Sequence, residues 1–496
     1  MTARAEVRVT SHSSGVPNAM PSTVPVPPPT PPVEERFDLV VVGGGKGGKT
    51  LAMDLAKAGR TVAMIEREMI GGSCINVACI PTKSLVASAR LLGVLRRADS
   101  LGVHVGDAHV DLDLLRAHKE GVVGDMVALH RELFAASGMD FILGQARFVG
   151  PGLVEVVTDA GGRRLLRGEQ VVINTGTRPK LPDIPGLASC GAMTSEDVLR
   201  LEWIPPRVAV IGGGFVGSEL AQMLQAFGSE VTQLVRGDRL LSGEEPEVSA
   251  ALLDSFTRDG IAVRLGVSVT SVSAASVTGS AGGIELTLSD GGTLQVDAIV
   301  VATGRRPVTS DLGLDAAGVA LDARGFVIVD DALATTAPNT WAVGDVTGHA
   351  EFTHASYDDY RIVKANLAGG SRSTTGRLIP SVVFVEPEIA RIGLTEAEAL
   401  AAGHSISVAV QKVIAIPRSR TLRQTEGFWK IIVDRATDRI LGASLVGVDS
   451  GEVIAVIQTA MLADAPYTLL QDAIIAHPTM AEGLTTAFAS LTPSVG

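Results

Sequence analysis

The sequence predicts an α/β protein with two Rossmann-like domains and a C-terminal α+β domain. The glycine-rich pattern G-x-G-x-x-G occurs twice, at residues 43–48 and 212–217, each time after an apolar run and before a helical pattern. From about Pro380 the pattern changes to separate strands and helices, which suit an α+β cap better than a third nucleotide-binding unit. The 496 residues correspond to about three domains at roughly 150 residues each.

The composition argues against several classes of partner. The net charge is −12 and the sequence has no basic stripe, so we expect no nucleic-acid partner. No apolar run approaches the ~18 residues of a membrane span, so we expect no membrane partner either. Three cysteines are too few for a secreted disulfide scaffold, which favours a cytoplasmic protein whose disulfide is catalytic or transient.

The first 35 residues form a separate segment. Eight prolines lie between Pro17 and Pro32, in a low-complexity sequence that cannot build a packed core. The segment lacks the apolar region of a signal peptide, and Glu6 disfavours a transit peptide. We expect a disordered Pro-rich tail over residues 1–35, either a dispensable extension or the result of a misplaced start codon.

The first glycine-rich turn lies in the context of a dinucleotide site. Gly43 permits a tight turn, Gly45 lets the backbone approach a pyrophosphate, and Gly48 allows a helix to pack closely on a strand. Glu66 follows Gly45 by 21 residues and can accept a hydrogen bond from a ribose hydroxyl. The expected elements are a strand over Phe37–Val42, a helix over Thr50–Gly59 and a strand over Thr61–Ile65.

The second turn repeats the pattern with a different specificity residue. Its glycines are Gly212, Gly214 and Gly217, between strands over Val208–Ile211 and Glu230–Val235. Two dinucleotide sites are expected where one nucleotide passes electrons to another. Arg236 and Arg239 follow the second strand, and no acid occupies the ribose position. Because an arginine accommodates a 2′-phosphate, we expect NADP(H), with NAD the alternative if the arginines are only solvated loop charges.

Three further segments belong to these units. Two buried-strand runs end in Thr175-Gly176 and Thr303-Gly304, and each closes one nucleotide-binding unit. A later strand ends in Gly344-Asp345, where Asp345 could bond a ribitol hydroxyl of a flavin. A Gly-Asp pair alone is a common turn, but this one follows a complete dinucleotide site.

Two of the three cysteines, Cys74 and Cys79, lie in the segment GGSCINVACIPTK just after the first unit. This position suggests a redox-active disulfide beside a flavin. A zinc site would need further ligands, and no second cysteine pair exists, so we expect no metal site. Cys190 lies in a loop-like stretch and is expected to be inert.

In this order, the motifs resemble the FAD-dependent pyridine nucleotide–disulfide oxidoreductases, which include dihydrolipoamide dehydrogenase, glutathione and mycothione reductases and mercuric reductase. The first helix and the segment Asp358–Arg361 look most like the branch of the reactive-chlorine-resistance flavoprotein. The matching segments are the two glycine-rich turns, the C-x4-C segment with Pro81-Thr82-Lys83, the Thr-Gly exits, Val343-Gly344-Asp345, Pro380–Phe384 with Glu386-Pro387-Glu388, and His477–Glu482.

The resemblance implies a domain order and an electron path. The NAD(P) domain is inserted within the FAD domain, and the C-terminal domain builds a homodimer whose active site is shared across subunits. NADPH passes electrons through FAD to the Cys74–Cys79 disulfide, Cys74 attacks the substrate, and Cys79 contacts the flavin. The expected ranges are 36–180 and 309–378 for the two parts of the FAD domain, 181–308 for the NAD(P) domain and 379–496 for the interface domain.

The resemblance also assigns residues around the flavin. Lys83 is expected near its reactive nitrogen, with Glu219 as the partner of the lysine. The alternative for Glu219 is a favourable acid in the first turns of a helix. Phe215 matches an aromatic residue that covers the empty nicotinamide site in relatives, although plain helix packing explains it equally well.

The segment around His477 has two interpretations. Thr479–Glu482 is a capping box, in which Glu482 only caps a helix. By resemblance, His477 is instead the general acid/base at the thiols of the partner subunit, oriented by Glu482. We favour the catalytic interpretation because the whole segment matches the family.

The electron acceptor is left open. A small disulfide is the first hypothesis, because the C-terminal cysteine pairs of mercuric reductases and of high-molecular-weight thioredoxin reductases are both missing. The second is a metal-ion reductase, for Hg(II) or Cu(II), or an oxidant-defence reductase using the same thiols. The third is a dihydrolipoamide dehydrogenase component of a larger assembly or a slow redox sensor, although Arg236 argues against an enzyme that reduces NAD.

Overall fold

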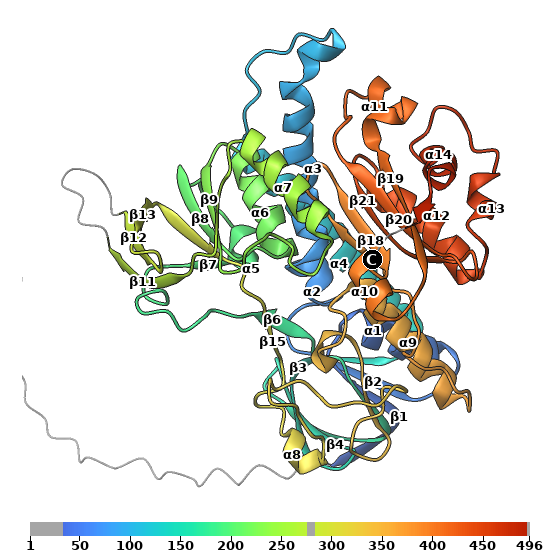
Figure 1. The fold of residues 1–496 in the computed structure, drawn as a ribbon. Helices are drawn as coiled ribbons and strands as arrows, with labels where there is room; N and C mark the ends of the chain where they lie inside the picture. The colour runs from blue at the N-terminus through green and yellow to red at the C-terminus, as the bar shows by residue number, and fades with distance from the viewer. Residues whose placement is uncertain (1–32, 275–282, 494–496) are drawn as a thin grey trace, which may run out of the picture.

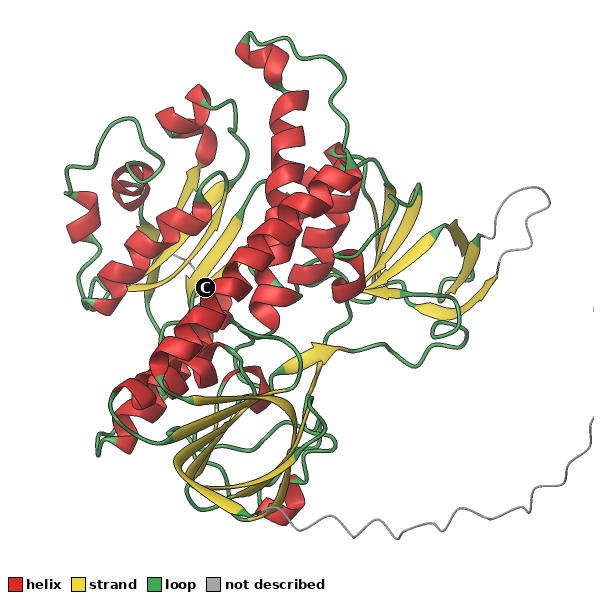
Figure 2. Cartoon of the chain, turned by 180° about the vertical axis from the view of Figure 1, so that it is seen from behind, coloured by secondary structure: helices red, strands yellow, loops and turns green. Residues whose placement is uncertain are grey.

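The computed structural model describes residues 33–274 and 283–493, which form three lobes around a central group of helices (Figures 1 and 2). In Figure 1 the first lobe lies at the bottom, the second lies at the left in green, and the third lies at the right in orange and red. The expected disorder of the N-terminal tail falls outside the described residues.

The first lobe is a six-stranded sheet that closes on itself. β1 pairs in parallel with β2 and β5, while β4 pairs antiparallel with both β3 and β5, so that the strands form a ring. Helix α1 (Lys46–Lys57) follows β1 and packs against α9 (Thr353–Leu367). The strands are β1 (Glu34–Val42), β2 (Val62–Glu66), β3 (Asp140–Gly150), β4 (Leu153–Thr158), β5 (Arg163–Ile173) and β16 (Thr340–Ala342).

The first strand begins earlier than the sequence predicted. β1 starts at Glu34, inside the expected tail of residues 1–35 and three residues before the expected strand start at Phe37. Ion pairs explain the extension, because Arg167 contacts Glu34 at 2.8 Å and Arg164 contacts Glu35. These contacts between charged neighbours in β1 and β5 keep two acidic residues in the strand where the apolar pattern has not yet begun.

The central helices connect the lobes. α2 (Ser73–Asn76) and α3 (Cys79–Arg96) follow β2, and α3 packs against α4 (Leu112–Ser137) and α6 (Phe215–Ala226). Among the described residues, the stretch Ser73–Arg96 is long and apolar enough to cross a membrane, with a mean hydropathy of 1.3. No such segment was predicted from the sequence. Core helices pass the same test, and α3 packs against two other helices of the chain.

The second lobe contains the second glycine-rich turn. Its parallel sheet has the order β10-β9-β8-β14-β7, and a three-stranded antiparallel sheet lies beside it. Helices α5 (Ser195–Val198) and α7 (Pro246–Arg258) complete the lobe with α6. The strands are β7 (Met193–Thr194), β8 (Arg207–Ile211), β9 (Glu230–Val235), β10 (Ala262–Leu265), β14 (Ala298–Val301), and then β11 (Val269–Ala274), β12 (Ile284–Leu288) and β13 (Thr293–Val296).

One short antiparallel pair links the first two lobes. The chain leaves the first lobe through β6 (Thr177–Pro179) and returns through β15 (Arg305–Pro307), which pairs with β6. β16 then joins β5 in the first sheet, where Thr340 pairs with Val171. The second lobe is therefore inserted within the first, as the resemblance implied.

The third lobe is an antiparallel sheet covered by helices. Its strand order is β17-β18-β21-β20-β19-β22, and its core contains the fully buried Trp429. Buried Lys430 joins this lobe to the second lobe, because its Nζ contacts Glu245 at 3.2 Å and Glu247 at 3.1 Å. The elements are β17 (Ser381–Val383), β18 (Ile389–Gly393), β19 (Ile406–Lys412), β20 (Phe428–Asp434), β21 (Ile440–Val446), β22 (Thr492–Pro493), α10 (Glu396–Ala401), α11 (Pro417–Thr421), α12 (Ser450–Leu462), α13 (Thr468–Gln471) and α14 (Gly483–Ala489).

Candidate active site

The first glycine-rich turn packs against the end of β5. Gly43 has φ +101°, and a Cβ there would lie 2.4 Å from the carbonyl oxygen of Asn174. The Asn174 side chain accepts a hydrogen bond from the Gly48 amide at 2.8 Å and donates to the Val343 carbonyl at 2.7 Å. Gly45 and Gly48 both lie against this side chain, where a Cβ would come within 2.6 and 2.9 Å. Asn174 therefore ties the turn to β5 and to the segment after β16.

Glu66 stabilises the same turn from the other side. One carboxylate oxygen accepts a hydrogen bond from the Gly44 amide at 2.7 Å, and the other accepts from the amides of Glu68 and Met69 at 3.0 Å each. The side chain also lines the adjacent cavity. The structure therefore gives Glu66 a backbone role in addition to the ribose contact predicted from the sequence.

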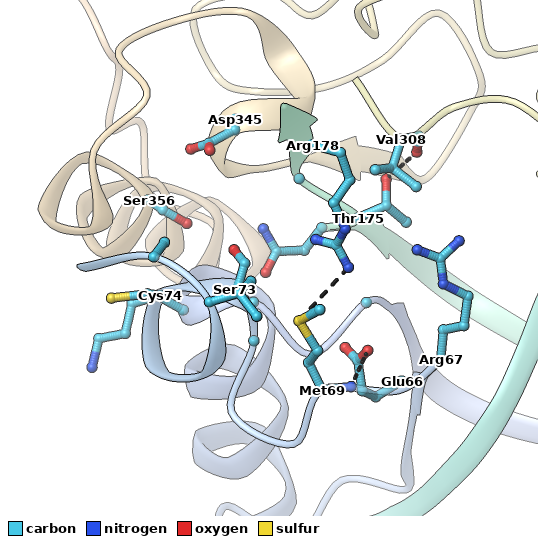
Figure 3. A pocket seen from close by; sticks show the side chains of 18 of the residues that line it. Glu66, Arg67, Met69, Ser73, Cys74, Thr175, Arg178, Val308, Asp345 and Ser356 are labelled. Atoms are coloured by element: carbon cyan, nitrogen blue, oxygen red, sulfur yellow. Dashed lines mark hydrogen bonds between the residues drawn. The ribbon is translucent and has the colours of Figure 1, made fainter. Parts of the chain in front are cut away.

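A single cavity runs from this turn to the cysteines and to Asp345. Figure 3 shows Glu66, Thr175, Asp345 and Cys74 around it. Thr175 donates to the Val308 carbonyl at 2.7 Å, and Gly176 beside it has φ +68°. Asp345 accepts a hydrogen bond from Thr177 at 3.1 Å, and burial raises the pKa of its carboxyl group against the pull of the Arg305 charge.

These features fit a flavin dinucleotide. The glycine-rich turn at the start of α1 offers backbone amides for a pyrophosphate. The buried Asp345 carboxylate, with Thr177 as its side-chain partner, is suited to accept hydrogen bonds from ribitol hydroxyls. Gly344 before it has φ +72°, and a Cβ there would lie 2.7 Å from the Ser356 hydroxyl, so the backbone must pass close to α9.

The two cysteines lie at one end of this cavity. Cys74 belongs to α2, and Cys79 is the first residue of α3, facing the open cavity. Both are free thiols. A hydrogen bond from Cys74 lowers the pKa of Cys79 to about 6; burial opposes this shift, while the Thr353 hydroxyl and the Lys83 charge assist it. The same hydrogen bond, together with burial, raises the pKa of Cys74.

Residues from all three lobes meet beside Cys79. Lys83 Nζ lies 2.6 Å from a carboxylate oxygen of Glu219, which is only 5% exposed. The other oxygen of Glu219 accepts a hydrogen bond from the Phe384 amide at 2.9 Å, and Lys83 Nζ lies 4.7 Å from the centre of the Phe384 ring. Because the pair spans the lobes, its geometry depends on how they pack together.

A second cavity opens at the second glycine-rich turn. Gly212 has φ +124°, and a Cβ there would lie 2.3 Å from the Ala302 carbonyl oxygen, whereas Gly214 has no atom within 4 Å of its Cβ position. Gly217 packs against the Gly212 carbonyl, and Gly304 has φ +121°. Arg236 is exposed and lines the cavity, and Arg239, also in its wall, donates to the Ser242 carbonyl at 2.8 Å.

Phe215 lines this second cavity. Its ring centre is 6.3 Å from that of Phe352, which in turn stacks on His354 at 5.1 Å. The ring also packs against the core around α6. The geometry therefore agrees with both interpretations of Phe215, and its role stays a prediction.

The comparisons with known proteins decide the family. A model described as pyridine nucleotide-disulphide oxidoreductase matches residues 37–359, and a model of the dimerisation domain of that family matches residues 379–488. The chain belongs to this family. Membership implies FAD and a pyridine nucleotide as cofactors, and the dimerisation domain indicates a homodimer.

Several relatives span nearly the whole chain. A probable pyridine nucleotide-disulfide oxidoreductase, RclA, of Escherichia coli is 38% identical over 91% of this chain and 99% of its own length. A mercuric reductase of Streptomyces lividans is 35% identical (92% and 97% covered), and a dihydrolipoyl dehydrogenase of Chlamydia muridarum is 31% identical (91% and 96%). A solved structure, a Cu(II) complex of the HOCl-induced flavoprotein disulfide reductase RclA of E. coli, has a TM-score of 0.84 and 38% identity, covering 92% of this chain and 99% of that one.

The His477–Glu482 pair of this oxidoreductase lies on the third lobe. His477 Nδ1 is 2.8 Å from a Glu482 oxygen, and the histidine side chain is 69% exposed. The Glu482 amide donates to the Thr479 hydroxyl at 3.3 Å, but α14 begins at Gly483 with Glu482 as its N-cap, so the predicted capping box does not form. The Glu482 carboxylate bonds the histidine instead. His477 does not line the cysteine cavity of its own chain.

Asn174 and Thr353 hold parts of the oxidoreductase site together, although no role was predicted for either from the sequence. Thr353 Oγ1 lies 3.6 Å from Cys79 Sγ. Asn174 could have been found from the sequence, because it is a polar residue at the end of the apolar run over β5. No signal pointed to Thr353, because its contact joins residues 274 positions apart. Among the described residues, no group of three or more His, Cys, Asp or Glu side chains could hold a metal ion.

Proposed function

We propose that the protein uses NADPH to reduce a small disulfide, with Cys74 as the attacking thiol. The arrangement of the two cysteines carries this proposal. Cys79, at the start of α3, lies beside Thr353 and under the influence of the Lys83 charge, which favours a thiolate there. Cys74 holds the proton that the pair retains near pH 7.

The residues of the first cavity would hold FAD. The Gly43–Gly45 turn would bind its pyrophosphate and Asp345 its ribitol, and the Lys83–Glu219 pair would lie at its reactive part. FAD supplies two-electron transfer between the nicotinamide and sulfur. The Lys83 ammonium, neutralised in part by Glu219 at 2.6 Å, places positive charge where negative charge develops during that transfer.

The disulfide exchange then needs only the two cysteines and a proton donor. Cys74 loses its proton and attacks one sulfur of the substrate; a mixed disulfide forms and the first product thiolate leaves. Cys79 attacks Cys74, which reforms the Cys74–Cys79 disulfide and releases the second product thiolate. The two product thiolates take up two protons, one of them the proton that Cys74 gave up.

His477 of the partner subunit would handle these protons. The His477 ring is exposed on the third lobe and oriented by Glu482, so it is available to a second chain. The dimerisation domain supports a homodimer, and in the proposed dimer that ring would face Cys74 of the other subunit. A histidine titrates near neutral pH and can both accept the Cys74 proton and return it to a leaving thiolate.

A metal ion or oxidant as electron acceptor is the second candidate. It is favoured by the relatives, which include mercuric reductases and a Cu(II) complex of an HOCl-induced reductase. The cysteine cavity is open enough to expose Cys79, so an ion could reach the thiols. A dihydrolipoamide dehydrogenase function is the weaker alternative, because the second cavity presents Arg236 at the position where an acid would favour NAD.

Steady-state turnover of the FAD-loaded protein tests these candidates. NADPH and NADH oxidation would be followed with oxidised glutathione, mycothiol disulfide, lipoamide, Hg(II), Cu(II) and hypochlorite as acceptors. We expect turnover with at least one disulfide, and Cys74→Ser should abolish it while NADPH still reduces the flavin. Turnover with metal ions alone would favour the second candidate, and turnover with no acceptor would contradict the proposal.

His477→Ala tests the shared site, with His404→Ala as the matched control. His404 forms a similar pair with Asp434, at 3.1 Å, on the same lobe. We expect His477→Ala to lower disulfide turnover by roughly 100-fold or more without changing flavin reduction by NADPH. His404→Ala should leave both rates unchanged, and near-normal turnover of His477→Ala would exclude it as the acid/base.

A further inference from the structure

Lys49 is a buried cation that the proposed mechanism does not use. It lies on α1, inside the first glycine-rich unit, and is only 3% exposed. Its Nζ donates to the Gly71 carbonyl at 2.7 Å and lies 2.8 Å from His130 Nε2 on α4. Burying an ammonium group costs free energy unless the group is hydrogen-bonded and its charge is compensated, so a buried lysine at this position suggests a specific role.

The hydrogen bonds of His130 fix the charge of this pair. His130 Nδ1 lies 2.7 Å from the Met126 carbonyl oxygen, which can only accept, so Nδ1 carries a proton. The neutral ring then offers Nε2 as an acceptor to the Lys49 ammonium. Burial lowers the pKa of Lys49 to about 8 and also lowers that of His130, so near pH 7 the proton stays on the lysine.

The Lys49 ammonium holds the loop that carries Cys74. Gly71 and Gly72 have φ +89° and +82°, and a Cβ on Gly72 would lie 2.9 Å from the Cα of Gly45. Asn76 fixes the other side of this loop by donating to the Ile70 and Gly72 carbonyls at 2.9 Å each. With Lys49 on the Gly71 carbonyl, the backbone leading to Cys74 is tied to α1.

The same ammonium acts on the Cys74 sulfur through its charge. The hydrogen bond with Cys79, burial and the Cys79 charge raise the pKa of Cys74, whereas the Thr353 hydroxyl and the Lys49 charge lower it. The effect is mutual, because the Cys74 charge raises the pKa of Lys49. The charge of Lys46 on α1 lowers the pKa of Lys49, and the charge of Glu66 at the end of β2 raises it. His130 is the hydrogen-bond partner of Lys49.

We propose that Lys49, supported by His130, is a positioning residue for Cys74: it anchors the loop that carries the thiol and stabilises the negative charge that the sulfur needs in order to attack. This inference rests on the role of Cys74 in the proposed function. It places a cation within the same subunit, while His477 arrives from the partner. Lys49 and His130 therefore stabilise negative charge on the Cys74 sulfur even before a substrate or the partner's His477 is in place.

Alkylation of the reduced FAD-loaded protein tests this role. Iodoacetamide labelling between pH 6 and 10, with peptide mapping, gives separate rates for Cys74 and Cys79. Lys49→Met should slow Cys74 labelling about tenfold at pH 7, where the lysine is protonated, and move the labelling profile to higher pH by about one unit. Cys79 labelling should stay within twofold, and Lys49→Arg, which keeps the charge, should recover most of the Cys74 rate.

Two outcomes would overturn the inference. One is a Lys49→Met protein that retains FAD and shows the Cys74 profile of the unmodified protein. If that variant loses FAD, His130→Asn decides, because removing the ring should slow Cys74 labelling about threefold; an unchanged Cys74 profile there contradicts the role. Labelling needs no substrate, so a protein that reduces no disulfide would contradict the proposed function and not this inference.

Discussion

The two glycine-rich turns share one steric constraint and differ in another. Gly43 and Gly212 both have a positive φ, and a Cβ on either would strike the carbonyl oxygen at the end of a neighbouring strand, at 2.4 and 2.3 Å. At the middle glycine the turns diverge. A Cβ on Gly45 would lie 2.6 Å from the Asn174 amide oxygen, whereas the Cβ position of Gly214 is open to 4 Å.

The difference comes from the residue at the end of the neighbouring strand. In the first unit it is Asn174, which bonds both Gly48 and Val343; in the second unit it is Ala302, whose side chain can make no hydrogen bond. The first turn is thereby locked to two other segments of its lobe. The second turn keeps free space beside its backbone, which suits a nucleotide that must bind and leave in every cycle.

The largest effect should follow from unlocking the first turn. Asn174→Ala removes two buried hydrogen bonds and leaves the Val343 carbonyl without this partner, which costs about 2–4 kcal/mol of unfolding free energy. We expect loss of FAD during purification and a lower midpoint of denaturation. Asn366→Ala is the control, because that amide also makes two backbone hydrogen bonds, with Arg372, at an exposed site. Equal changes in FAD retention and in the denaturation midpoint for both variants would show that the Asn174 hydrogen bonds have no special role.

A smaller effect is expected at the open middle glycine. Gly214→Ala should leave stability and FAD content unchanged, because no protein atom opposes the new methyl group. It should raise KM for NADPH roughly 10- to 100-fold by displacing the pyrophosphate. Gly243→Ala, at another open glycine outside the cavity, should change neither quantity. An unchanged KM in Gly214→Ala would mean that the nucleotide does not approach this turn.

A tenfold effect is expected at the exposed end of the second site. Arg236→Ala should raise KM for NADPH about tenfold, or about 1.4 kcal/mol, and leave KM for NADH unchanged. Arg435→Ala, at an exposed arginine on the third lobe, is the control. Steady-state kinetics with both nucleotides distinguish the outcomes. Comparable kcat/KM values for NADH and NADPH in the unmodified protein would remove the basis for NADP preference.

The smallest effect is expected from protonation of the Cys79 thiolate in the first cavity. The pKa of Cys79 is lowered from 9.0 to about 6, so its thiolate persists above about pH 6 and is protonated as the pH falls through that value. Iodoacetamide labelling of Cys79 in the reduced protein should therefore halve near pH 6. Labelling that rises only near pH 9 would contradict the arrangement.

Local steric rules explain what the sequence predicted well. Gly43 and Gly212 are visible in the sequence because a positive φ and a close carbonyl oxygen admit only glycine. The insertion of one unit within the other follows from the order of the motifs along the chain. The pairing of Lys83 with Glu219 was implied by resemblance, and the structure brings the two side chains to 2.6 Å.

Contacts between distant residues explain what the sequence did not predict. Asn174 reaches Gly48 across 126 positions, and Lys430 reaches Glu245 across 185. Lys49 carries no sign in the sequence that its partner is His130, because helical periodicity gives the buried face of α1 and α4 but not which side chains meet. The start of β1 was misplaced for a related reason, since ion pairs with β5 extend it beyond its apolar run.

The short β6–β15 pair has a consequence for how the second lobe could be replaced by that of a relative. The residues at which the chain enters and leaves the second lobe face each other, with Arg178 opposite Arg306. A domain whose two ends lie side by side can be exchanged as one cassette with little disturbance of its host. Preference for one reduced nucleotide could therefore be transplanted from a relative by two crossovers at this pair, with the flavin and the cysteines left in place.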